Sequence, residues 1–169
     1  MAKKSSSKKS MKKVGLDFLA LIFSGAIFGL LALPFINHKI TTGIGESIST
    51  TSGYDLLNFE ADAGVATLIL LFIIFASFAV LLALTKMLID AGVLKAGNAN
   101  KIIGFCLLIM TLAILIVSIV TMIVIPSKCS SSSIGSLFSA GSYAGWLGLI
   151  FVTVSGLLSF VSSIFAIKK

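Results

Sequence analysis

The sequence predicts an all-α membrane protein, an antiparallel bundle of four transmembrane helices with a small ordered segment on its outer side. Each of four apolar stretches holds about 20 or more residues with few charges, enough for a helix to cross a hydrocarbon layer of about 30 Å. They lie at about 14–36, 63–89, 102–125 and 145–167. Apolar residues make up 57% of the 169-residue chain and charged residues only 11%, which is unlike a soluble domain.

Lysine positions predict how the helices are oriented. All thirteen basic residues are lysine, and eleven lie in residues 1–13, in the segment 86–101 or at the C-terminus. The outer segments 37–62 and 126–144 hold only Lys39 and Lys128. Because cytoplasmic segments of membrane proteins are enriched in basic residues, both termini are predicted to be cytoplasmic. The composition favours a bacterial plasma membrane.

Residues 1–13 are rich in lysine and show no apolar periodicity, so a disordered polybasic tail is predicted there, followed by a transmembrane domain over 14–169. The tail either fixes the orientation alone or also binds anionic lipid. The first apolar run is longer than the 7–15 residues usual in a signal peptide core, so we expect an uncleaved helix.

Small residues mark the helix faces that are expected to pack against one another. Lipid offers helices no hydrophobic gain on association, so glycine and serine stabilise contacts by letting backbones approach closely. The predicted packing positions are Gly25, Gly29, Gly104, Gly145, Gly148, Ser155 and Ser159. The GxxxG pattern at 25–29 fits packing within the bundle or a homodimer. The stripe along the fourth helix fits packing or the lining of a pore.

The outer segment 37–62 is too long for a simple connection, so it is expected to be ordered. Alternating residues over 40–50 predict a short strand or hairpin with its isoleucines on one face. Ser52 and Asp55 match a capping box, which predicts a short helix after it. This segment is either a partner-binding surface or a cap over the helices. The candidate surface residues are Ile44, Ile48, Tyr54, Leu56, Leu57 and Phe59. The other outer segment, 126–144, is expected to be mobile.

Charged side chains inside the spans are rare. Asp17 is the one carboxylate within a predicted span, one helical turn after Lys13, and Lys86 and Asp90 are four residues apart. Both pairs are predicted to be ion pairs at the membrane interface. Alternatively, Asp17 is a coupling carboxylate, and its position resembles that of the acidic residue in the first helix of small multidrug transporters in broad placement only.

The sequence predicts no catalytic residue, no cofactor and no metal site. His38 is the sole histidine, and Cys106 and Cys129 lie about 35 Å apart along one helix, too far for a disulfide. The absence of arginine argues against nucleic-acid binding. The four-helix plan resembles claudin-like and tetraspan proteins in topology, without their paired cysteines or tryptophan in the outer segment, so no family assignment follows.

The expected function is therefore that of a non-catalytic membrane scaffold or accessory subunit, which acts through segment 37–62 and the small-residue helix faces. Its partners would be the lipid bilayer, and a membrane protein or further copies of this chain. The alternative is a small transporter or pore subunit that uses Asp17 and the stripe of the fourth helix.

Overall fold

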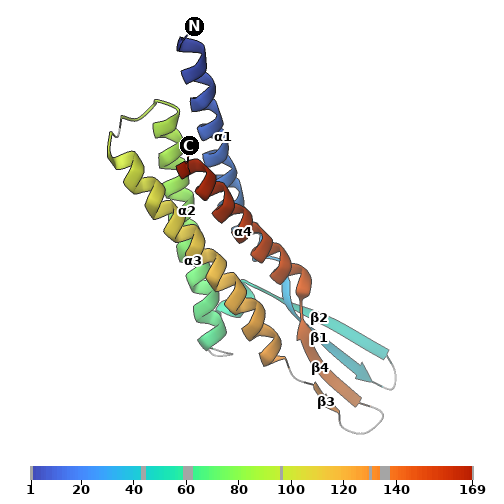
Figure 1. Cartoon of the computed structure of the whole chain (residues 1–169). Helices are drawn as coiled ribbons and strands as arrows, with labels where there is room; N and C mark the ends of the chain where they lie inside the picture. The colour runs from blue at the N-terminus through green and yellow to red at the C-terminus, as the bar shows by residue number, and fades with distance from the viewer. Residues whose placement is uncertain are drawn as a thin grey trace.

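Four long helices form the body of the protein in the computed structural model, which describes residues 2–42, 45–58, 63–95, 97–129, 131–133 and 138–168. They are α1 (Ala2–Leu30), α2 (Ala63–Asp90), α3 (Ala99–Lys128) and α4 (Trp146–Lys168). All four are long and apolar enough to cross a membrane, α1 through its part Met11–Leu30. Both chain ends and the α2–α3 connection lie at one end of the bundle (Figure 1). The prediction of four long apolar helices is confirmed.

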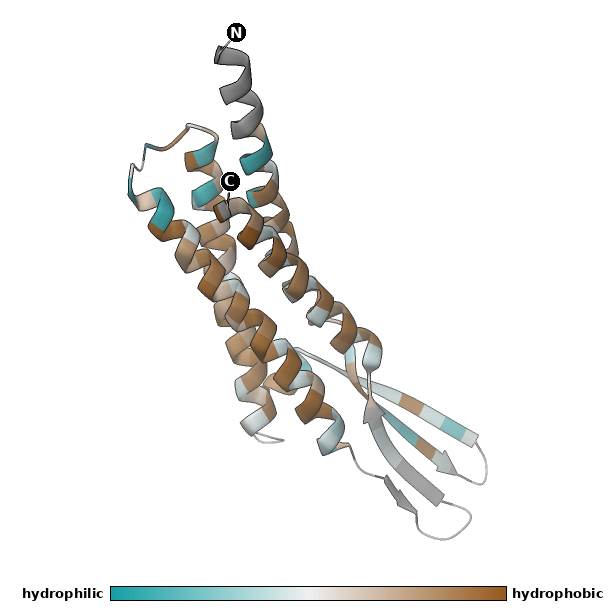
Figure 2. Cartoon of the chain, in the orientation of Figure 1, coloured by the Kyte–Doolittle hydropathy of each residue, from teal (hydrophilic) through white to brown (hydrophobic). Residues whose placement is uncertain are grey.

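The helices close into a bundle, because each contacts the next along the chain and α1 also contacts α4. Ile27, Phe72, Leu107 and Ile114 are completely or almost completely buried between them. The outward faces are also apolar, because many large hydrophobic side chains of the helices are exposed, and Figure 2 colours most residues of the helices brown. Such a surface is unfavourable in water and suits surrounding lipid.

The first helix differs from its predicted extent at both ends. It was expected to continue to residue 36, but it ends at Leu30, and a strand begins at Pro34. Proline has no N–H to continue the helix, and it restricts the residue before it to extended backbone. At the other end the helical backbone begins at Ala2, within the segment predicted to be disordered. Lysine and alanine are good helix formers and can extend a helix that is already packed.

The two outer segments together form one antiparallel sheet at the end of the bundle away from the chain ends (Figure 1). Its strands are β1 (Pro34–Thr42), β2 (Gly45–Ser52), β3 (Ser131–Ser133) and β4 (Phe138–Ala144), in the order β2-β1-β4-β3. The predicted strands between the first two helices are confirmed. The expectation of a mobile second segment is wrong for its described part, because β4 pairs with β1.

The register of the hairpin corrects the predicted face of its isoleucines. Ile40 pairs with Ser47, and Ile48 pairs with Lys39. Directly paired residues point to the same face, and neighbours along a strand point to opposite faces. Ile40 and Ile48 therefore lie on opposite faces of the sheet, because the connection between β1 and β2 reverses the alternation. Ile44 falls in that connection, outside the described residues.

The sheet is fastened to the bundle where β1 meets α4. Phe35 is completely buried, and its carbonyl oxygen accepts a hydrogen bond from the Gly145 N–H at 2.7 Å. A Cβ atom added at Gly148 would lie 2.7 Å from both Phe35 Cδ1 and the Pro34 carbonyl oxygen. Only glycine permits this approach, so the start of α4 is shaped to receive the start of β1.

A short 3₁₀-helix, η1 (Asp55–Leu57), follows β2 and confirms the predicted short helix. The Ser52 N–H and hydroxyl both donate to Asp55 Oδ2, at 2.8 and 2.7 Å, and the Asp55 N–H donates back to Ser52 Oγ at 3.3 Å. This is the reciprocal pattern of a capping box. The hydrogen bonds from Ser52 hold the pKa of the Asp55 carboxyl below its usual value.

We predict that Gly148→Ala destabilises the protein while Gly29→Ala does not. The new methyl group at position 148 must displace Phe35 or Pro34, at a cost of about 1–3 kcal/mol. At Gly29 nothing lies within 4 Å of the Cβ position, and alanine favours the helix. Thermal unfolding midpoints of the detergent-solubilised proteins measure the difference. Equal midpoints would show that β1 does not pack on α4.

Candidate functional site

A cluster of charged side chains lies inside the bundle near the end that carries both termini. Lys86 of α2 donates hydrogen bonds to Asp17 Oδ2 of α1 at 3.2 Å and to Asp90 Oδ2 at 2.6 Å. Asp17 Oδ1 is 3.0 Å from the same nitrogen, an ionic contact without hydrogen-bond geometry. Asn100 Nδ2, in the first turn of α3, donates to Asp90 Oδ1 at 2.8 Å. We call these four residues the ionic cluster; it links three of the four helices.

Burial makes this cluster electrostatically strong. The side chains of Asp17 and Lys86 are 0% and 5% exposed, so water screens neither charge. A buried charge without a partner is very unfavourable, whereas here Lys86 faces two carboxylates. In contrast, the Lys39–Glu46 pair on the sheet, at 2.8 Å, has side chains 41% and 54% exposed. Exposed pairs of that kind contribute little to stability.

The ionic cluster corrects the pairing expected from the sequence. Asp17 was predicted to pair with Lys13 on its own helix, but its partner is Lys86, and the pair is buried between helices. The predicted Lys86–Asp90 pair is present. Gly104 of α3 makes room for this arrangement, because a Cβ atom there would lie 3.2 Å from Lys86 Cε and 3.5 Å from Ile167 Cγ1. Gly104 therefore lies in close contact with both the aliphatic part of Lys86 and the end of α4.

The serine stripe of α4 faces α1. Ser155 Oγ donates to the Phe23 carbonyl oxygen at 2.7 Å, and Ser159 Oγ and Ser24 Oγ share a hydrogen bond of 2.7 Å. Ser159 Oγ is also 3.5 Å from the Ala20 carbonyl oxygen. All of these contacts join different helices, so these hydroxyls are engaged in helix packing. Double-mutant measurements of such contacts in membranes average about 0.6 kcal/mol each.

The glycines of the predicted packing set differ in their surroundings. Gly145 and Gly148 contact β1, whereas Gly25 has only Val80 Cγ2 of α2 at 4.0 Å from its Cβ position. Gly29 is exposed, and no described atom of another element lies within 4 Å of its Cβ position, so no helix packs closely against that position. Gly156 was not in the set, yet a Cβ there would lie 3.1 Å from Ser118 Oγ of α3. It directly follows Ser155 but faces α3, whereas the serines of the stripe contact α1, so the stripe did not include it.

Most described residues of the predicted partner surface attach the sheet to the bundle. Tyr54 donates its hydroxyl to the Phe28 carbonyl oxygen of α1 at 2.7 Å. Leu56 and Leu57 are half-buried and pack against the core. Ile48 is different, because 61% of it is exposed at the middle of the edge strand β2. Phe59, like Ile44, lies outside the described residues.

The remaining candidate residues have ordinary surroundings. His38 Nε2 is 3.0 Å from Thr51 Oγ1 of the neighbouring strand. Cys106 and Cys129 are free thiols, each partly buried. Within the described residues no three His, Cys, Asp or Glu side chains gather as a metal site would require. Comparison of the chain with protein-family models, with curated proteins and with solved structures found no match.

We predict that Lys86→Met destabilises the protein more than Asp17→Asn does. Removing Lys86 leaves two carboxylates without their cation, a change that typically costs about 3–5 kcal/mol when the site is buried. Removing the charge of Asp17 leaves the Lys86–Asp90 pair in place. Denaturation in mild detergent measures both. Lys39→Met is the control, expected to cost less than about 1 kcal/mol. A loss from Lys86→Met no larger than from this control would contradict a buried ionic cluster.

Proposed function

We propose that this chain is a non-catalytic scaffold or accessory subunit of a membrane, which presents its sheet to a membrane-protein partner. The described chain divides into two parts with different surfaces. The bundle has an apolar exterior suited to lipid, and the sheet extends beyond it, with residues 46–50 of its outer strand β2 exposed (Figures 1 and 2). This division gives the helices the role of an anchor and the sheet the role of a binding surface.

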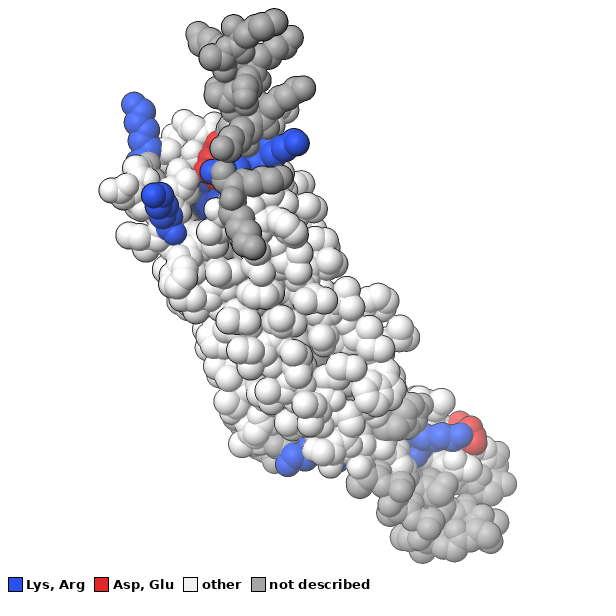
Figure 3. Space-filling model, in the orientation of Figure 1, with Lys and Arg blue, Asp and Glu red and all other residues white. Residues whose placement is uncertain are grey.

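The proposed orientation puts both termini in the cytoplasm, in a bacterial plasma membrane, with the sheet outside. The distribution of lysine supports it. Figure 3 shows blue lysines at the end near the N-terminus and a few near the sheet, with a long uncharged stretch between them on this face. Eleven of the thirteen lysines lie in segments at the end near the termini, and the positive-inside rule places such an end in the cytoplasm. Attraction of the N-terminal lysines to anionic lipid is part of the proposal.

The exposed edge of the sheet is the single observation that carries the proposal. Residues 46–50 of β2 are all exposed, and β2 is an outer strand in the sheet order. An outer strand presents unpaired backbone N–H and C=O groups that a partner strand can bind. Ile48 adds an exposed apolar side chain at the middle of this edge. A membrane protein that pairs with β2 is the partner we propose; a second copy of this chain is the other outcome of the test.

The experiment is chemical crosslinking in intact cells, with identification of the crosslinked protein, for the parent and two variants. We predict that Ile48→Ser strongly reduces the crosslinked product, because it removes the apolar contact from one face at the edge. Ile40→Ser is the matched control, since Ile40 is 40% exposed on the opposite face of the inner strand β1. Equal yields of crosslinked product from the parent and from Ile48→Ser, with both proteins folded, would refute a partner that contacts Ile48 on β2.

The alternative function, a small transporter or pore subunit, has the buried Asp17–Lys86 pair in its favour. Ionisable groups within membrane spans often carry ions or protons. Against it, Ser155 and Ser159 are engaged with α1, and Asp17 already has a cation as partner. We predict that an Asp17→Asn protein that inserts and folds supports the same cellular phenotype as the parent protein, where the phenotype is the one lost when the gene is deleted. A folded Asp17→Asn protein that behaves like a deletion would favour the transporter.

A further inference from the structure

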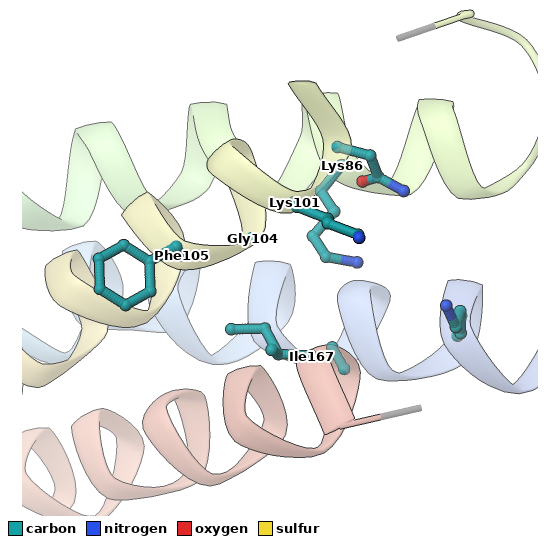
Figure 4. Close-up of a pocket in the computed structure, with 8 residues that line it drawn as sticks. Lys86, Lys101, Gly104, Phe105 and Ile167 are labelled. Atoms are coloured by element: carbon teal, nitrogen blue, oxygen red, sulfur yellow. The ribbon is translucent and has the colours of Figure 1, made fainter. Parts of the chain in front are cut away.

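A pocket of about 280 Å³ lies beside the ionic cluster, between the ends of the four helices near the termini. Its polar side is formed by Lys13, Lys86, Asn100 and Lys101, and its apolar side includes Phe105 and Ile167. Figure 4 shows Lys86 and Lys101 extending from α2 and α3 towards the side on which α1 and α4 lie; Ile167 lies at the end of α4, and Phe105 lies further along α3. The pocket thus joins positive charge to an apolar wall.

The charges around the pocket favour an anion with one negative charge. Lys86 is paired with Asp17 and Asp90, whereas Lys13 and Lys101 form no ion pair with a carboxylate among the described residues. Among the described side chains, the three lysines that line the pocket and the two carboxylates paired with Lys86 leave one net positive charge. A phosphodiester carries one negative charge, and lysine is a common phosphate ligand.

Asn100 points to a second property of the ligand. Its amide nitrogen donates to Asp90, so the orientation of the amide is set by a hydrogen bond. Its oxygen Oδ1 is buried and receives no hydrogen bond. A buried acceptor without a donor is unfavourable, and because Asn100 lines the pocket, a ligand hydroxyl that displaces the atoms covering this oxygen would satisfy it.

The apolar wall determines which phosphate compound fits. Phe105 is 60% exposed on the outward face of α3, and Ile167 is 43% exposed on α4. In the proposed membrane both side chains would meet lipid acyl chains. A soluble phosphate would leave this wall unused, whereas a phospholipid would cover it.

We propose that this pocket binds the headgroup of an anionic phospholipid with a free hydroxyl, of the phosphatidylglycerol type. The phosphate lies between Lys13 and Lys101, a headgroup hydroxyl donates to Asn100 Oδ1, and an acyl chain lies along Phe105 and Ile167. The inference rests on the membrane embedding proposed above and not on the partner at the sheet.

Native mass spectrometry of the full chain in mild detergent tests the site, with phosphatidylglycerol as the probe and phosphatidylcholine as the neutral lipid. Lys13→Gln/Lys101→Gln is expected to weaken phosphatidylglycerol binding about tenfold or more. Lys12→Gln/Lys95→Gln is the matched control, because it removes two exposed lysines at the same end that do not line the pocket. The control is expected to change binding by about twofold at most.

Three results would overturn parts of the assignment. Equal weakening by the two double variants would show that charge at the surface, and no pocket, attracts the lipid. Displacement of phosphatidylglycerol by an equal concentration of glycerol 3-phosphate would show a site for soluble phosphate. Phosphatidylmethanol has the same charge without hydroxyls, and binding as tight as that of phosphatidylglycerol would refute the contact with Asn100. The assay contains no protein partner, so its failure leaves the proposed function of the sheet to be judged by crosslinking.

Discussion

The apolar outer surface of the four helices is the constraint on which the rest of the structure depends. Large side chains such as Phe78, Leu81, Ile123 and Leu147 are more than half exposed on these helices. In the proposed membrane such residues would be equally well placed on the inside or the outside of a bundle. Association there would rest on close packing and on polar contacts that lipid cannot replace.

The two ends of the bundle meet this constraint by different means. At the end near the termini the ionic cluster joins α1, α2 and α3 through charged hydrogen bonds. At the other end Gly145 and Gly148 admit the first residues of β1, and the β1–β4 ladder joins the two outer segments. Between the ends, serine hydroxyls connect α4 to the backbone of α1. Specific contacts thus occur along the length of the bundle.

The helices were predictable from the sequence because length and hydropathy are local properties. The contact partners of individual side chains were harder to predict, because they depend on the depth of each residue in the bundle and on the register between neighbouring helices. Asp17 lies nearly two turns inside the start of its span at Met11, and Lys86 lies about one turn before the end of α2. Because α1 and α2 are antiparallel, these two positions lie at similar depths from the same end of the bundle. A comparison of the depths of charged residues would therefore have identified the Asp17–Lys86 pair. Lys13 was predicted as the partner because it is the nearest cation in the sequence. That prediction did not consider that Asp17 would be buried against α2, where Lys86 is the available cation.

The sheet shows the same limit. The strands of segment 37–62 were recognised from their alternation, but β4 was not. Its sequence, Phe-Ser-Ala-Gly-Ser-Tyr-Ala, is dominated by small residues that are weak strand formers, so its pairing with β1 and β3 accounts for the strand. The opposite placement of Ile40 and Ile48 likewise follows from the hairpin register, which residue alternation cannot supply.

The central claim is that the sheet and the α2–α3 connection lie on opposite sides of a membrane. Single-cysteine labelling in intact cells tests it most directly, with both native cysteines replaced by serine. The residues to compare are Ser49 on β2 and Lys95 in the α2–α3 connection, both exposed. We predict that Ser49→Cys reacts with an impermeant thiol reagent in intact cells and that Lys95→Cys reacts only after permeabilisation. Reaction of Lys95→Cys in intact cells, with Ser49→Cys protected or equally reactive, would contradict the account.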